Sequence, residues 1–344
     1  IALAAVVAGC ATPDPVPPES ARALAIVAVA ATPTKDNVLR SLATDTALED
    51  RILALDPNHV SEADVATTLS KAPAPHIMLI HGGVYPVHLM MESTGKFLVK
   101  MGYPEDRIRD PAGDRRWSHS PYEDSAHLAG LLAWYYEREG LRPMMIGHSQ
   151  GGTQAVKILY ELAGRFSDSI RVFDPYKDAV LDRTTIVDPL TGVQRPVVGI
   201  ELSYASTIGA GGMTLLLPNQ WSMLDKMYAI PDSVEDYTGF VLDFDPIGWR
   251  GTYSPTGKAT VRNVELPLSY NHLTTPYVSP LADDKAIREW IAAYVPGHAV
   301  SAPPGENAGY ATVWAADVWF SIKKHWVLEA QRLIRARRTA IGQS

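Results

Sequence analysis

The chain contains, at residues 144–152, the sequence MMIGHSQGG, which predicts a sharp turn between a strand and a helix. Its first three residues are large and apolar, as is typical of a short buried strand. Apolar residues at helical spacing follow between positions 153 and 163. Because glycine has no side chain, the glycines of this stretch allow the strand and the helix to approach closely. The sequence therefore predicts that Ser149 lies at a corner of the backbone.

Strand and helix patterns alternate along much of the chain on both sides of this turn. The apolar runs that predict buried strands occupy residues 77–80, 144–146, 197–202, 240–244 and 266–270. The helical patterns occupy residues 122–139, 153–163, 283–295 and 308–338. This alternation predicts an α/β fold with a mostly parallel sheet covered by helices on both faces. No linker after residue 35 is long enough to separate two domains, so we expect one domain over residues 21–344.

The composition argues against several classes of protein. Of the 344 residues, 46% are hydrophobic and 20% are charged, which is enough apolar material for a large core. The formal net charge of -7 argues against a nucleic-acid partner, since proteins that bind phosphate backbones usually carry a basic surface. The single cysteine, Cys10, rules out a disulfide framework and a metal site built from several cysteines. No apolar run reaches the roughly 18 residues of a membrane-spanning helix.

The first twenty residues have the pattern of a targeting segment. Residues 1–9 are apolar and too short to span a membrane, as is typical of the core of a secretory signal. Residues 7–10 resemble the lipobox of bacterial lipoproteins, which implies cleavage before Cys10 and lipidation of its side chain. Residues 11–20 are rich in proline and predict a semi-rigid tether. The alternative is an ordinary signal peptide that contains a cysteine.

These features predict an exported protein of the bacterial cell envelope, attached to a membrane through Cys10. Ala11 resembles the sorting signal for an outer membrane, and a periplasmic or secreted protein is the alternative. No charged segment and no methionine precede the apolar run, so we expect the chain to begin part-way through its precursor. After the tether, residues 23–31 predict a strand and residues 36–55 predict a helix.

Residues 147–151 fit the pattern G-x-S-x-G, in which a serine on a strained strand-to-helix turn acts as a nucleophile. The pentapeptide alone is only moderately specific. Here the required context is present, because an apolar strand pattern precedes it and a helical pattern follows it. Ser149 is therefore the predicted nucleophile. The alternative is a small residue packed in a strand–helix turn.

This motif, its flanks and the upstream pair His81-Gly82 resemble the α/β-hydrolase superfamily, most closely its bacterial lipases and esterases. The resemblance covers roughly residues 75–295. A serine at the turn is unlike the epoxide hydrolases and haloalkane dehalogenases of this fold, which have aspartate there. It is also unlike the dienelactone hydrolases, which have cysteine. The resemblance implies an α/β-hydrolase fold and hydrolysis of carboxylic esters through an acyl-enzyme, without a metal or an organic cofactor.

An acyl-transfer site needs N–H donors for the negative charge that develops on the carbonyl oxygen. The backbone N–H of Gln150, directly after the nucleophile, is one predicted donor. The second is expected from the loop after residue 80, and the resemblance to lipases implies Gly83, with Val84 as the alternative register. A tight exit from the strand, without a catalytic role, would also explain His81-Gly82-Gly83.

In this fold the acid and then the histidine follow the serine along the chain. Only His272, His298 and His325 lie downstream of Ser149. His325 lies within a helical pattern and is expected on the helix surface, and His298 is expected in a loop. His272 follows a predicted strand and precedes a predicted helix, where the fold places its general base. His272 is therefore the predicted base.

The acid of the triad is less well determined by the sequence. Residues 239–246 offer Asp243 and Asp245 on the same face of a predicted strand. Asp245 is favoured because Pro246 ends the strand there, which lets the carboxylate turn toward the histidine. Asp243 lies deeper in the strand, where an unpaired charge is costly to bury.

A segment rich in large apolar residues, 205–238, separates two of the predicted strands. It predicts either a cap or lid that lines an acyl pocket or an additional part of the core. Together these features predict a serine esterase or lipase acting on a small-molecule ester or a lipid. The alternatives are an acyltransferase with the same triad, or a catalytically inactive envelope lipoprotein that binds partners. The oligomeric state is not predicted.

Overall fold

The structure is a computed structural model that describes Leu39, Leu42 and residues 44–249, 251–266, 269–298, 302–305 and 311–342. Cys10, the tether of residues 11–20 and the strand expected at 23–31 lie outside the described residues. Most of residues 36–45, the first half of the helix expected at 36–55, also lie outside the described residues. The second half of that expected helix contains the observed helix α3 (Thr46–Ala54). No helix within the described ranges is long and apolar enough to cross a membrane.

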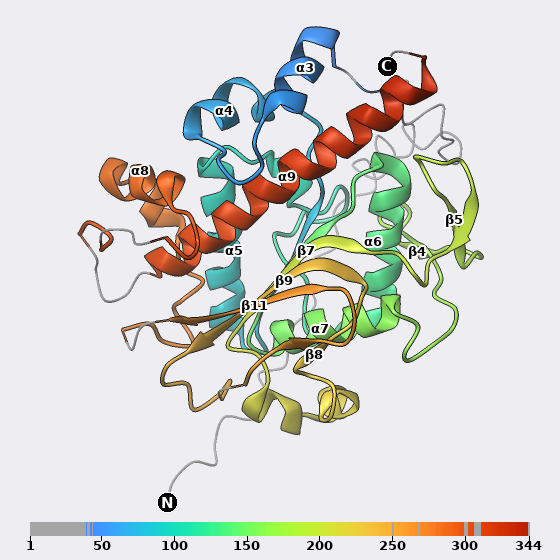
Figure 1. Cartoon of the computed structure of the whole chain (residues 1–344). Helices are drawn as coiled ribbons and strands as arrows, with labels where there is room; N and C mark the ends of the chain where they lie inside the picture. The colour runs from blue at the N-terminus through green and yellow to red at the C-terminus, as the bar shows by residue number, and fades with distance from the viewer. Residues whose placement is uncertain are drawn as a thin grey trace, which may run out of the picture.

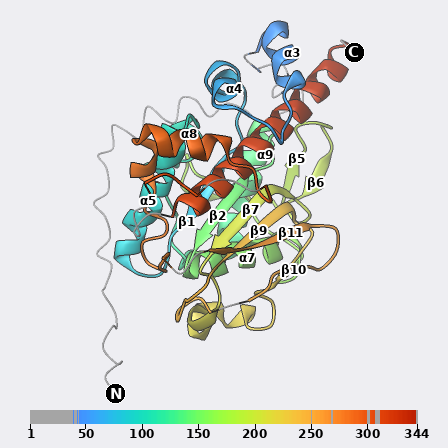
Figure 2. The same ribbon diagram turned by 60° about the vertical axis from the view of Figure 1, so that its left-hand side comes forward.

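The centre of the fold is a five-stranded sheet in which all neighbouring strands are parallel (Figure 1, Figure 2). Its strands, in spatial order, are β1 (Ile77–Ile80), β2 (Met144–His148), β7 (Leu202–Ile208), β9 (Val234–Leu242) and β11 (Thr260–Leu266). Since the strands run in the same direction, all their carboxyl ends lie at one edge of the sheet. This arrangement confirms the predicted α/β fold with a parallel sheet.

Helices cover both faces of the sheet. One face packs against α5 (Tyr85–Lys100), α8 (Lys285–Ala293) and α9 (Thr312–Ala340). The other face packs against α6 (Ser125–Glu139) and α7 (Gln150–Leu162). Side chains alternate along a strand, so consecutive residues of β2 belong to different cores: Met144 and Ile146 lie in the first and Met145 lies in the second. The long helix α9, red in Figure 1, runs across the first face.

The remaining elements are short and lie around this framework. They comprise the helix α4 (Glu62–Thr67), the 3-10 turns η1 (Leu69–Lys71), η2 (Glu105–Arg107) and η5 (Ser279–Ala282), and the strand pairs β3–β4 (Phe173–Asp174, Ala179–Val180) and β5–β6 (Thr185–Val187, Gln194–Pro196). A further pair, β8 (Ala229–Ile230) with β10 (Ser254–Pro255), is parallel.

Three predicted strands are displaced from the observed ones. Residues 197–201 precede β7, and the strand consists of residues 202–208, which include buried Ser203, Ser206 and Thr207 and so lack a continuous apolar run. Strand β9 begins at residue 234, earlier than the predicted 240. Strand β11 occupies residues 260–266 rather than 266–270, because it is an edge strand with partly exposed side chains. The apolar-run criterion fails for strands of this kind.

Helix α5 was not predicted, because Pro86 and Gly95 are unfavourable within a helical pattern. Pro86 lies in the first turn, where its missing N–H has no cost. Gly95 lies against Trp117, and a Cβ at this position would lie 2.5 Å from the indole ring. Close packing on the aromatic ring therefore explains the glycine inside the helix.

The segment outside the sheet between β7 and β9 consists of residues 209–233, which is shorter than the predicted 205–238. Residues 205–208 and 234–238 instead pair within the sheet. The segment contains the 3-10 turns η3 (Gly212–Leu216) and η4 (Pro218–Met223) and then β8, and it lies at the bottom of Figure 1. We refer to residues 209–233 as the insertion.

Candidate active site

Ser149 lies at the turn between β2 and α7, in a backbone conformation that L-residues rarely adopt. Its φ is 57° and its ψ is -126°. The backbone N–H of Ser149 donates a hydrogen bond to the carbonyl of Ile208 in the neighbouring strand, at 2.9 Å. The Ser149 carbonyl accepts the N–H of Gly152 at 2.9 Å, which closes the first turn of the helix. The backbone of the serine is thus strained and fixed on both sides.

The glycines around Ser149 allow this turn because other backbone lies directly against them. A Cβ on Gly147 would lie 2.5 Å from the carbonyl oxygen of Gly151. A Cβ on Gly151 would overlap the carbonyl oxygens of Ile80 and His81 at the end of β1. Any larger residue at position 147 or 151 would therefore force the strand, the helix and the neighbouring loop apart.

The structure brings Ser149, His272 and Asp245 together. Nε2 of His272 lies 2.7 Å from Oγ of Ser149, and Nδ1 of His272 lies 2.7 Å from Oδ2 of Asp245. Their exposed fractions are 7%, 6% and 7%, so all three are buried. Each follows the carboxyl end of a different strand, β2, β11 and β9 respectively. A carboxylate can only accept a hydrogen bond, so Nδ1–H donates to Asp245 and Nε2 is free to accept the serine proton.

The environment of Asp245 keeps its carboxylate ionised. Burial alone raises the pKa of Asp245, but the hydrogen bond and charge of His272 and two backbone N–H groups hold the pKa below its ordinary value. Those N–H groups belong to Ile247 and Gly248, and each lies 2.8 Å from Oδ1. Asp243, the alternative acid, is half-buried, and the carboxylate bonded to His272 Nδ1 is that of Asp245.

The other two downstream histidines lie away from Ser149. His298 is exposed, and its Nδ1 lies 3.4 Å from the carbonyl of Pro296. The expectation that His325 lies on a helix surface is wrong, because α9 packs closely against the sheet and buries this side chain. Its Nε2 lies 3.1 Å from Asp236, and its ring stacks on Tyr204.

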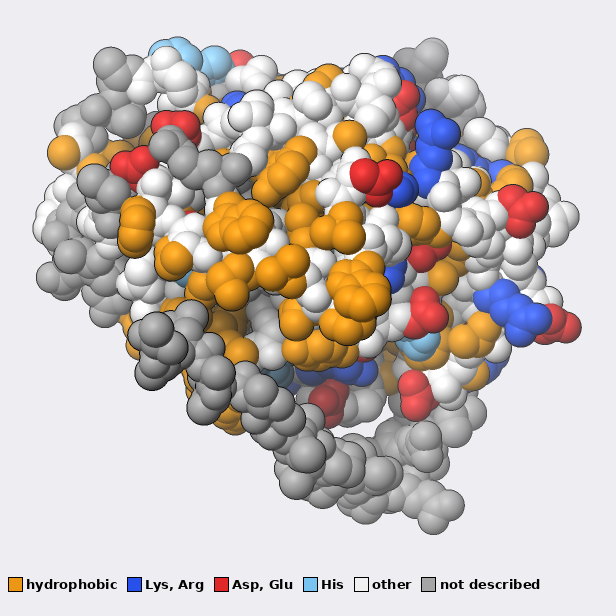
Figure 3. All heavy atoms as spheres, turned by 90° about the horizontal axis from the view of Figure 1, so that it is seen from below, with side chains coloured by type: hydrophobic (Ala, Val, Ile, Leu, Met, Phe, Trp, Pro, Cys, Tyr) orange, Lys and Arg blue, Asp and Glu red, His pale blue; other side chains and the backbone are white. Residues whose placement is uncertain are grey.

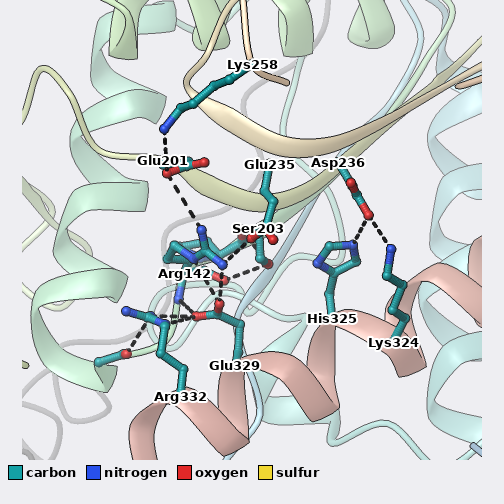
Figure 4. A network of polar contacts seen from close by, with 12 residues as sticks. Arg142, Glu201, Ser203, Glu235, Asp236, Lys258, Lys324, His325, Glu329 and Arg332 are labelled. Atoms are coloured by element: carbon teal, nitrogen blue, oxygen red, sulfur yellow. Dashed lines mark hydrogen bonds and ion pairs between the residues drawn. The ribbon is translucent and has the colours of Figure 1, made fainter. Parts of the chain in front are cut away.

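His325 belongs to a polar network at the amino edge of the sheet, opposite the edge that carries Ser149 (Figure 4). At its centre, buried Glu329 of α9 accepts hydrogen bonds from Arg142 and Arg332. A cavity of about 690 Å³ lies here, lined in part by Arg142 and Lys258. Both cations face carboxylates, since Arg142 also pairs with Glu235 and Lys258 lies near Glu201. The bonds between Glu329 and Arg142 tie α9 to the residues just before β2.

The predicted oxyanion donors belong to two different segments that adjoin Ser149. Gln150 is the first residue of α7, and Gly83 lies in the loop between β1 and α5. This loop packs directly on the serine, because a Cβ on Gly82 would lie 3.0 Å from the Cβ of Ser149. The side chain of Gln150 lies over Gly83, and its Nε2 donates to Asn219 of the insertion at 3.3 Å. The nucleophile, the loop after β1 and the insertion are therefore in mutual contact.

Two side chains fix the orientation of the loop after β1. Burial lowers the pKa of His81 to about 4, so its imidazole is neutral, and Nδ1–H donates to the carbonyl of Gly82 at 2.7 Å. In a trans peptide the next N–H points away from that carbonyl, so the N–H of Gly83 points away from His81. The Tyr122 hydroxyl donates to the carbonyl of Gly83 at 3.2 Å. Sequence reasoning assigned no role to either side chain.

Exposed large apolar side chains occur in the segments that carry or adjoin the triad residues and Gly83. They lie beside Gly83 at the start of α5, at Tyr122, on the insertion, beside Asp245 and after His272. Figure 3 shows apolar side chains gathered on the face below the sheet in Figure 1. We refer to these residues as the apolar rim: Val84, Tyr85, Leu89, Tyr122, Met213, Leu216, Leu217, Trp221, Leu224, Phe244, Trp249, Leu273 and Tyr277. Apart from Val180, Val193 and Ile341, they are all the exposed large apolar residues of the described chain.

One side of the insertion belongs to the core, as one of the two predictions expects, and the other side belongs to the apolar rim. Leu215, Met223 and Met227 are buried against the face that carries α6 and α7. A hydrogen bond of 2.9 Å joins the hydroxyls of Thr153 and Thr214, which attaches the insertion to α7.

Within the described ranges, no group of three or more histidine, cysteine or acidic side chains has the geometry to hold a metal ion. No protein-family model matches the chain, and no curated protein matches it. Function must therefore be inferred from the arrangement of residues around Ser149.

Proposed function

We propose that this protein is a serine hydrolase with the α/β-hydrolase fold that cleaves carboxylic esters through an acyl-enzyme intermediate. The observation that carries the proposal is the continuous hydrogen-bonded chain Ser149–His272–Asp245, with 2.7 Å at each contact. A nucleophile bonded to a base, which in turn is oriented by a buried carboxylate, is the arrangement that serine hydrolases share.

Acylation begins when Oγ of Ser149 attacks the ester carbonyl carbon and Nε2 of His272 takes the serine proton. The C–O bond that forms moves negative charge to the carbonyl oxygen, where the backbone N–H groups of Gln150 and Gly83 stabilise it. His272 then gives its proton to the alkoxide as the alcohol leaves. Asp245 stabilises the imidazolium that exists between these two transfers.

Deacylation repeats the same steps with water. His272 takes a proton from water, and the resulting hydroxide attacks the acyl carbon of the ester on Ser149. When the tetrahedral intermediate collapses, His272 returns the proton to Oγ and the carboxylic acid leaves. Every proton taken up is returned, so the side chains of the triad are regenerated after each turnover.

The apolar rim favours ester substrates that carry large apolar groups. Exposed apolar side chains are rarely clustered on a soluble protein without a binding role. Here they come from several segments that also carry or adjoin triad and oxyanion residues. A substrate with a long acyl chain or an aromatic alcohol would cover part of this surface while its carbonyl reaches Ser149. Each methylene buried in this way contributes about 0.8 kcal/mol.

The sequence also supports a proposal for where in the cell this activity takes place. We propose that Cys10 carries a lipid anchor that holds the hydrolase at a membrane of the bacterial cell envelope. Expression of the precursor in a bacterial host, followed by mass measurement of the mature N-terminal peptide, tests this part. A Cys10 with three acyl chains at the new N-terminus is expected, whereas cleavage at another residue would contradict the anchor.

The activity itself is tested with 4-nitrophenyl esters of increasing acyl length. We expect turnover by the wild-type protein, with kcat/KM rising from acetate to longer chains. The Ser149→Ala variant provides the control and should lose all but the background rate. Absence of turnover on every ester would contradict the proposed function, and a preference for acetate would contradict the role of the apolar rim. Addition of an alcohol and analysis of the products distinguishes hydrolysis from acyl transfer.

A further inference from the structure

We propose that His148, the residue before the nucleophile, is a positioning residue that holds the backbone of His272. The inference rests on the proposed function, because it concerns how the base reaches Ser149. Nε2 of His148 lies 2.7 Å from the backbone carbonyl oxygen of His272, and the His148 side chain is fully buried. The two residues are 124 positions apart, so this bond joins two distant parts of the chain.

The direction of this hydrogen bond follows from its acceptor. A carbonyl oxygen only accepts, so Nε2 of His148 carries the proton and donates it. Burial, followed by the nearby charge of His272, lowers the pKa of His148 to about 3. The ring is therefore neutral at any pH where a histidine base works, and it has a single N–H. That N–H is committed to the carbonyl of His272.

The bond couples the base to the nucleophile a second time. The side chain of His272 contacts Oγ of Ser149 directly, and its backbone contacts the ring of the residue covalently attached to Ser149. Any shift of the turn after β2 therefore shifts both contacts of His272 together. This coupling keeps Nε2 of His272 and Oγ of Ser149 in register.

His272 needs such a contact because it lies outside the regular elements. It follows β11 by six residues, and residues 272–276 form turns. The side chain of Asn271 caps the N–H groups of Leu273 and Thr274, at 3.1 and 3.0 Å. These local bonds shape the turn, whereas the bond from His148 attaches it to the edge of the sheet.

The His148 ring also occupies the space between this turn and the loop after β1. A Cβ on Gly82 would lie 3.3 Å from Nδ1 of His148. The rings of His148 and His272 lie 5.1 Å apart between centroids. One imidazole thus separates the loop that carries Gly83 from the turn that carries the base. Its size and its donor both matter, and substitutions can separate the two contributions.

The test compares His148→Gln with His148→Met. The two new side chains are unbranched and similar in length, but only glutamine has an N–H donor. We expect His148→Met to lower kcat by about 10²-fold, the cost of a displacement of about 1 Å at a catalytic group. KM should change little, because His148 does not touch the substrate. His148→Gln should recover most of the lost kcat, and thermal unfolding of both variants identifies any that fail to fold.

A second comparison distinguishes positioning from general support of the fold. In a His272→Ala background the base is absent, so His148→Met should cause no further loss of residual hydrolysis. Further loss in that background, or equal kcat for the glutamine and methionine variants, would overturn the inference. So would a His148→Met variant as active as the wild-type protein.

Reaction with a fluorophosphonate probe separates this inference from the proposed function. The probe needs Ser149 and its base but no ester turnover. A wild-type protein that reacts with the probe and hydrolyses no ester would overturn the proposed function alone. Probe reaction should then still slow in His148→Met and recover in His148→Gln. A wild-type protein inert to both would overturn both proposals.

Discussion

Oγ of Ser149 lies 2.7 Å from Nε2 of His272, although 123 positions separate the two residues along the chain. Ser149 follows strand β2 and His272 follows strand β11, and β7 and β9 lie between these two strands in the sheet. All the strands are parallel, so the segments that follow β2 and β11 meet at the same edge of the sheet. In open parallel sheets this carboxyl edge is the usual place of a ligand site. The parallel topology of the sheet therefore brings the serine into contact with its predicted base.

Asp245 should be the acid that orients His272. Replacement by asparagine leaves the shape but favours the wrong tautomer of the base, and kcat should fall by about 10⁴-fold. The Asp243→Asn variant is the matched control, with an expected loss of less than about 3-fold in kcat. Steady-state kinetics on one nitrophenyl ester measures both. The opposite order of the two variants would assign the acid to Asp243.

Gly151→Ala should destabilise the protein through overlap alone. Its Cβ would meet the backbone oxygens of Ile80 and His81, which cannot move without opening the end of β1. We expect the free energy of unfolding in urea to fall by about 3 kcal/mol or more, at the upper end for overpacking. In Gly83→Ala the nearest atom is the flexible end of the Gln150 side chain, so the loss should be smaller. Equal losses would contradict this account of the turn.

Glu329 should be the most sensitive residue of the network in Figure 4. Its side chain is fully buried between Arg142 and Arg332. Glu329→Ala would leave the buried side of Arg142 uncompensated, at an expected cost of about 3–5 kcal/mol. Glu235 also pairs with Arg142 but is 42% exposed, so Glu235→Ala should cost at most about 1 kcal/mol. Urea unfolding of the two variants measures the difference, and a larger loss in Glu235→Ala would be inconsistent with it.

His119 should make stability fall at alkaline pH. Its two ring nitrogens lie 3.2 Å from Asp110 and from Glu123. Burial alone lowers its pKa, but the two carboxylates raise the pKa of His119 to about 9. The folded pKa exceeds the unfolded value of about 6.5, so the contribution is complete below pH 6.5 and is lost as the pH rises through about 9. It amounts to something on the order of 3 kcal/mol.

The His119→Gln variant provides the comparison for this pH dependence. Glutamine cannot titrate, so the difference in unfolding free energy between wild type and variant should shrink between pH 6.5 and pH 9.5. A difference that stays constant over this range would show that His119 is not charged in the folded protein. Because the backbone of His119 bonds to Leu79 and His81, activity should decline over the same range.

The sheet was predictable where its buried strands consist of continuous apolar residues. Residues 77–80 and 144–146 form continuous apolar runs, and both runs match observed strands. Strand β7 buries serine and threonine, and β11 has a partly exposed face, so neither forms such a run in the predicted place. These two strands depend on pairing with β2 and β9, which the sequence does not display.

The residues of the candidate site could be predicted where neighbouring residues in the sequence indicate their role. Ser149 is indicated by the glycines near it in the sequence, and Asp245 is indicated by the proline that follows it. His148 and His81 gave no signal, because their roles depend on carbonyl groups and on burial that only the fold creates. The burial of His325 was missed for the same reason, since the helical pattern of α9 does not reveal that helix faces on several sides are covered.

The central claim is that Ser149 is an activated nucleophile, and mass spectrometry after reaction with a fluorophosphonate tests it most directly. The account predicts one phosphonyl group per chain, located on the peptide that contains Ser149, absent in Ser149→Ala and formed much more slowly in His272→Ala. A wild-type chain without the adduct, or a Ser149→Ala variant labelled to the same extent, would contradict it.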